Sequence, residues 1–235
     1  MDESLAGLRK QIDALDSQLS EMLAARLEVS RKVSAAKKDN NQVFRPAREA
    51  QLLNKLLAAA PASLQQLIPV VWRAIISSSI AEQRPDFTIL ASPQMGVEAI
   101  AFAAGQLGVK NSENLHTALA ELIDKQADIL LVSPAELCQI AGGLGPDKPA
   151  MVIACLPLEM PGQDSALHGE LFHARITGWI IGRPPAEQTD YDRGVFYLSD
   201  GNKIEIAELS RYENMSGAEL LGVCPVLQAE PPIKG

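Results

Sequence analysis

Polar side chains interrupt apolar helical stripes at several points of the first 84 residues. From Ser4 to Lys38, apolar residues recur every three or four positions, and Arg26 takes one position of that series. A guanidinium stays charged, so an apolar seam tolerates it only where an anion meets it. Lys37 follows eleven residues later, about 20° away around a helix, and projects from the same face. The pair predicts a binding site for an anion.

Three further residues stand out by their position on predicted helices. Arg9 lies seventeen residues before Arg26, about 100° away around the helix, so we expect it to serve a different groove. In the last of the helical segments, Ser79 and Gln83 continue an apolar stripe that recurs every four residues. Alternatively, Ser79 bonds the backbone of its own helix and Gln83 is frayed surface.

The chemistry of these groups is that of a binding site. No nucleophile lies beside a general base, and the sequence has no metal-ligand pattern and no glycine-rich phosphate loop, so we expect no cofactor and no metal. His116, His168 and His173 have no partner pattern, and we expect them to be non-catalytic. The set suits a dianionic ligand with a hydroxyl, in a reaction that needs orientation and charge stabilisation alone. Its members are Arg9, Arg26, Lys37, Arg48, Glu49, Ser79 and Gln83.

Three helices must position these side chains. The first, over 4–38, would be about 50 Å long, which is more than one small domain can cover, so we expect a partner chain. The second begins at Pro46 and stops at Pro61. The third opens with a capping-box pattern at Ser63 and Gln66 and reaches Arg84, and Pro69 either kinks it or moves its start to about residue 68.

Charge is divided unevenly along the 235 residues. Residues 1–85 hold 12 Lys and Arg against 9 Asp and Glu, a net of +3, which leaves 9 against 20, a net of −11, for the rest. We expect a small anionic ligand held locally and no nucleic acid partner. The absence of a signal segment, of a long apolar run and of paired cysteine spacing predicts a cytoplasmic protein with no membrane contact and with reduced thiols.

Residues 86–235 change to short β-rich runs with helices between them, which predicts a second, α/β domain joined at 84–86. The expected fold class is therefore multi-domain, with an all-α three-helix domain over 1–85 and an α/β domain over 86–235. We expect strands at 87–91, 127–132, 151–155, 176–181, 194–198 and 203–209.

The segments LRKQIDALDSQL, LAARLEV, VSAAK, RPAREAQLL and IISSSIAEQ resemble, in order and spacing, the all-helical AroQ-type chorismate mutases. The resemblance covers residues 4–84. It implies an intertwined homodimer of three-helix chains that rearranges chorismate to prephenate in phenylalanine and tyrosine biosynthesis, without cofactor or covalent intermediate. Arg45 departs from relatives that carry an acid at this point.

The resemblance also implies a role for each polar residue. Arg9 would reach the partner's site, Arg26 would bind a carboxylate, and Lys37 would bind a carboxylate and the ether oxygen. Gln83 would donate to the other side of that oxygen, which gains charge as the C–O bond breaks. Glu49 would bind the ring hydroxyl, and Arg48 would support the cluster. Ser79 would line the pocket.

Parts of 86–235, ASPQMGVEAIAFAAG and ALAELIDKQADILLVSPAEL, resemble a degenerate prephenate dehydratase, a two-lobed fold similar to periplasmic binding proteins. The Thr-Arg-Phe signature of that family is missing, since Arg175 is followed by Ile176 and Thr177, so we expect a regulatory or structural domain. Two alternatives stay open: a bifunctional mutase and dehydratase, and a non-catalytic dimeric metabolite sensor. Isochorismate also stays open as a substrate.

Overall fold

The computed structural model describes residues 4–36, 43–145, 147–156, 177–184, 193–199, 203–208 and 219–225. The helical part contains α1 (Leu5–Ala36), α2 (Pro46–Ala59), a short 3₁₀ helix (Ala62–Leu64) and α3 (Leu67–Gln83). The rest contains β1 (Thr88–Ala91), α4 (Gly96–Ala103), β2 (Gly108–Asn111), α5 (Leu115–Ile123), β3 (Ile129–Val132), α6 (Pro134–Ile140), a 3₁₀ turn (Ala141–Gly143), β4 (Met151–Leu156), β5 (Gly178–Gly182), β6 (Arg193–Ser199), β7 (Lys203–Glu208) and β8 (Glu219–Pro225).

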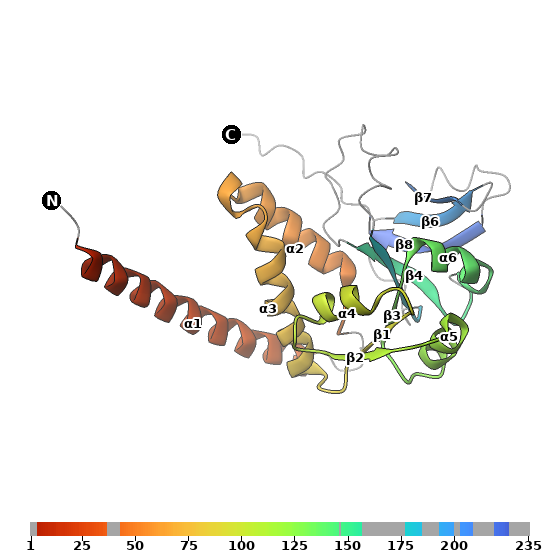
Figure 1. Cartoon of the computed structure of the whole chain (residues 1–235), viewed down its shortest axis with the longest axis horizontal. Helices are drawn as coiled ribbons and strands as arrows, with labels where there is room; N and C mark the ends of the chain where they lie inside the picture. The colour runs from red at the N-terminus through yellow and green to blue at the C-terminus, as the bar shows by residue number, and fades with distance from the viewer. Residues whose placement is uncertain are drawn as a thin grey trace.

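Helix α1 extends away from the rest of the chain (Figure 1). None of its residues is buried, and the apolar side chains of its stripe face solvent, with Leu5 65% and Met22 60% exposed. Only the C-terminal part of α1 packs on α3 (Figure 1). The prediction of one long helix is confirmed, and its apolar stripe has no cover among the residues that the structure describes.

Helix α3 begins at Leu67, later than the capping-box pattern predicts. The residues at 62–64 form the 3₁₀ helix, and Gln66 precedes α3 without a side-chain cap. The predicted capping box is therefore wrong, because Ser63 lies inside this separate 3₁₀ helix and the N-cap residue of α3 is Gln66. Pro69 is the third residue of α3, where a backbone N–H has no acceptor within the helix. The alternative that Pro69 moves the start of the helix to about residue 68 is therefore confirmed, with the start at Leu67.

The strands form one mixed eight-stranded sheet in the order β2-β1-β3-β5-β4-β8-β6-β7. Parallel pairs join β1 to β2 and β3, and β4 to β8, while the other neighbours are antiparallel. The six predicted strands are present, with ends shifted by a residue or two, and β2 and β8 were not predicted.

Alternate residues of the central strands serve two cores. In β1, Leu90 packs with α5 and α6 on one face, whereas Ile89 and Ala91 pack on the other face with α2, α3 and α4. The second core joins helical and α/β parts directly, because Phe44 meets Phe87 and Phe102 edge to face. The division at residue 85 stays a prediction. None of the described helices has the length and apolar character needed to cross a membrane.

Candidate active site

Helices α1 and α3 run in the same direction where they touch. Arg26 bonds to Ser79 and Ser30 bonds to Gln83, and in both pairs the partners are 53 residues apart. Because the second pair lies four residues further along both α1 and α3, one helical turn forward on α1 corresponds to one turn forward on α3. We call the group Arg26, Ser30, Ser79 and Gln83 the α1–α3 site.

Arg26 is the charged member of the α1–α3 site. Its Nη1 donates to the Ser79 hydroxyl at 2.6 Å and lies 3.5 Å from the Ile75 carbonyl oxygen. No carboxylate of the described residues pairs with it. Partial burial lowers the pKa of this guanidinium, which nevertheless stays charged at neutral pH. A half-buried cation without a carboxylate partner suits a bound anion.

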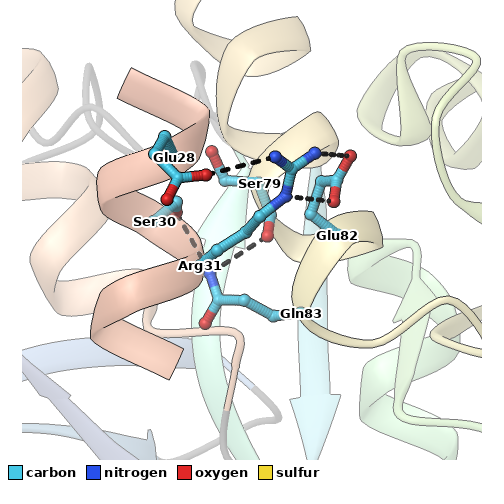
Figure 2. A network of polar contacts seen from close by, with 6 residues as sticks. All are labelled: Glu28, Ser30, Arg31, Ser79, Glu82 and Gln83. Carbon is cyan, nitrogen blue, oxygen red and sulfur yellow. Dashed lines mark hydrogen bonds and ion pairs between the residues drawn. The ribbon is translucent and has the colours of Figure 1, made fainter. Parts of the chain in front are cut away.

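Ser79 and Gln83 bond both to their own helix and to α1. The Ser79 hydroxyl donates to the Ile75 carbonyl at 3.0 Å, as the alternative interpretation expected, and also accepts the bond from Arg26. The Gln83 Nε2 donates to the Ser79 carbonyl at 3.0 Å and to the Ser30 hydroxyl at 3.3 Å (Figure 2). Gln83 is thus an ordered side chain at the contact of the two helices.

A charged clamp lies beside the α1–α3 site. Arg31 of α1 donates from Nε and Nη2 to the two carboxylate oxygens of Glu82 on α3, at 2.9 and 3.0 Å, and from Nη1 to Glu28 at 3.4 Å (Figure 2). The pKa of Glu82 is lowered by its hydrogen bonds and attraction to Arg31. Sequence reasoning missed this clamp and Ser30, because one sequence does not reveal the register between two helices.

Glu49, in the first turn of α2, contacts a different side of α3. Its carboxylate is 93% buried and accepts a 2.7 Å bond from Arg73, which is 86% buried, stacks 4.3 Å from the Phe102 ring centroid and donates to Ser77. Burial raises the pKa of the Glu49 carboxyl, and Arg73 opposes that shift. Ser77 and Ser79 point about 160° apart around α3, so within one chain Glu49 and Arg26 contact different faces of this helix.

The other predicted residues stand apart from this cluster. Arg9 lies on the exposed N-terminal half of α1, and Arg48 is exposed on α2. Lys37, His168, His173 and Arg175 lie outside the described residues, and His116 is exposed at the start of α5. Among the described residues, no group of three His, Cys, Asp or Glu side chains could hold a metal ion.

Residues 8–84 match the family model described as chorismate mutase type II, which spans about a third of the chain. The helical region is thus similar to the type II chorismate mutases. Members of this family are isomerases, and the match supports chorismate mutase activity in aromatic amino acid biosynthesis. No curated protein and no solved structure matches the chain.

Proposed function

We propose that this protein rearranges chorismate to prephenate in a cofactor-free pericyclic reaction. The observation that carries the proposal is the Arg26 guanidinium, which donates to Ser79 and has no carboxylate partner among the described residues. Its partner Ser79 lies one helical turn before Gln83 on α3. A pericyclic step needs a folded substrate and stabilisation of the charge that develops on the ether oxygen. Fixed donors on two packed helices provide both.

Each site residue has a proposed role. Arg26 binds a substrate carboxylate with the N–H groups that Ser79 does not use, and Lys37 binds a carboxylate and the ether oxygen. Both N–H groups of the Gln83 amide are engaged, so we propose that it gives up the longer bond, to Ser30, when it donates to that oxygen. Ser79 is proposed to line the pocket, where its hydroxyl accepts the hydrogen bond from Arg26. Arg48 and Glu49 are proposed for support and for the ring hydroxyl from the family resemblance.

We propose that the chain works as a homodimer with shared sites. The apolar stripe of α1 is exposed along its length, and an exposed stripe of this size indicates a protein partner. A second copy offers the same stripe, so two copies can cover each other. Arg9 lies on the half of α1 that extends away from its own α3, and a partner chain would receive it.

We propose a structural or regulatory role for the α/β part, with a dehydratase-like origin. Its core is continuous with α2 and α3 through Phe44, Phe87 and Phe102. A bifunctional enzyme would form phenylpyruvate from prephenate faster than the spontaneous background. A sensor would bind chorismate, prephenate or an aromatic amino acid in calorimetry and turn none of them over.

The deciding experiment is a product assay of the full chain with chorismate, prephenate and isochorismate in parallel. We expect loss of the chorismate diene absorbance and appearance of prephenate, and a much slower rate for Arg26→Met. No turnover of chorismate at micromolar enzyme would overturn the proposal. Pyruvate released from isochorismate at a higher rate would instead identify a lyase.

A further inference from the structure

Gln83 is the last residue of α3, and its position depends on how the chain leaves that helix. Arg84 follows in a non-helical conformation, and its N–H closes the last turn by donating to the Ile80 carbonyl at 2.8 Å. Pro85 then prevents further helix. The side chain that meets Ser30 therefore lies at the point where α3 ends, five residues before β1 begins at Thr88.

Arg84 is held by a buried carboxylate of the α/β part. Its Nη2 lies 2.6 Å from Oδ1 of Asp128, whose side chain is only 6% exposed. The other oxygen of Asp128 accepts the Thr88 backbone N–H at 2.8 Å, at the start of β1. One carboxylate thus ties the end of α3 to β1 and to the residue just before β3.

Arg84 and Asp128 each have one other, longer ion-pair contact. Arg84 also lies 3.5 Å from Asp86, but that carboxylate is 81% exposed and competes with water. The Nη2 of Arg183 lies 3.6 Å from the Asp128 carboxylate, and its Nη1 donates to the carbonyls of Leu122 and Ala127. The 2.6 Å ion pair with the buried Asp128 carboxylate is therefore the closer of the two that Arg84 makes, and it links the α3 terminus to the α/β part.

We propose that Asp128, acting through Arg84, is a positioning residue for Gln83, so that the α/β part completes the helical site. The inference rests on the proposed mutase function. A bond between Gln83 and the ether oxygen strengthens as charge develops there, so misplacing Gln83 lowers kcat more than it raises KM. The α/β part then contributes to catalysis without touching the substrate.

The test uses full-length Arg84→Met and Asp128→Asn, with Arg183→Met as the matched control, since Arg183 lies near the same carboxylate and bonds to the carbonyls of Leu122 and Ala127. We expect kcat for chorismate to fall about tenfold in the first two, with KM within about twofold. Arg183→Met should lower thermal stability and keep kcat. If Asp128→Asn does not fold, the partly exposed Arg84 still provides the measurement.

A second readout does not depend on activity. The side-chain NH₂ signal of Gln83, assigned by its loss in Gln83→Ala, should shift in Arg84→Met and stay in place in Arg183→Met. An unshifted signal with unchanged kcat overturns the inference, as does an equal loss of kcat in Arg183→Met, which would show general loosening. A wild-type chain that does not turn over chorismate overturns the mutase function itself, whereas an active wild type with a fully active Arg84→Met overturns only the role of Asp128.

Discussion

Arg26 of α1 donates a 2.6 Å hydrogen bond to the hydroxyl of Ser79 on α3. This bond fixes where the guanidinium points. Arginine has five N–H donors, and among the described residues the bonds of Arg26 come from Nη1 alone. The remaining donors are free to form a bidentate contact with a carboxylate.

Arg26→Met should remove substrate binding with little effect on folding. We expect kcat/KM for chorismate to fall by ~10²–10⁴, because a charge-assisted contact is lost in a partly buried site. The far-ultraviolet circular dichroism and the urea midpoint should stay close to wild type, since no described carboxylate is left unpaired. Lys32→Met, an exposed change on the same helix, is the matched control. A loss of less than about threefold in Arg26→Met would contradict the role of Arg26.

The Arg31–Glu82 clamp should stabilise the protein at neutral pH and lose its effect in acid. Because Arg31 lowers the pKa of Glu82, the folded state favours the carboxylate, so the stabilisation is present above the ordinary glutamate pKa of 4.5 and is lost as pH falls through the lower pKa of the folded state. Arg31→Met should therefore shift the urea midpoint downward at pH 7. The difference from wild type should shrink below pH 4.5 and in high salt. A difference that grows in acid would contradict this assignment.

Much of the helical part could be predicted, because its signals are local. The stripe of α1 follows from apolar spacing, and Ser79 and Gln83 share a face of one helix. The contacts between helices could not be predicted in the same way. The 53-residue offset that brings Arg26 to Ser79 depends on the connection between helices, and the pairing of Glu49 with Arg73 depends on the rotation of α2 against α3.

The unpredicted strands have weak local signals. β2 reads Gly-Val-Lys-Asn and is mostly exposed at an edge of the sheet, so it lacks an apolar run. β8 contains Gly222 and ends at Pro225, and both residue types argue against a strand when the sequence is read alone. Pairing with neighbouring strands outweighs these preferences.

The Glu49–Arg73 pair predicts the opposite pH dependence to the clamp. In Arg73→Met, the buried Glu49 carboxyl loses the cation that opposes the effect of burial, so its pKa rises further above the unfolded value. Stability should be close to wild type below pH 4.5 and fall as pH rises through the folded pKa. At neutral pH we expect a loss of ~3–5 kcal/mol in urea unfolding.

Adding Glu49→Gln to Arg73→Met should restore part of this stability, because the uncompensated charge is gone. The double variant should also lose the pH dependence that Arg73→Met introduces. The contrary result is that the stability losses of the single variants Arg73→Met and Glu49→Gln add up in the double variant, with the pH profile still that of Arg73→Met. That result would contradict the interaction between the two side chains that the structure shows.

Arg9 tests the proposed shared site through the geometry of α1. It lies seventeen residues before Arg26, about 100° around the helix, on the half of α1 that extends away from α3. It can complete a site only if a second chain receives it. Arg9→Ala and Arg26→Ala should each be nearly inactive alone, since every site in either homodimer lacks one cation.

Mixing the two inactive variants should restore activity. A heterodimer of Arg9→Ala and Arg26→Ala holds one site with both arginines and one site with neither, because the two arginines of a site come from different chains. With random equal exchange, half of the dimers are mixed and half of their sites are intact, so activity should approach about a quarter of wild type if each site works independently. Native mass spectrometry reports the exchange, and a mixture of two Arg26→Ala preparations is the control. Confirmed exchange with activity still at the level of the single variants would show that Arg9 does not act across the dimer.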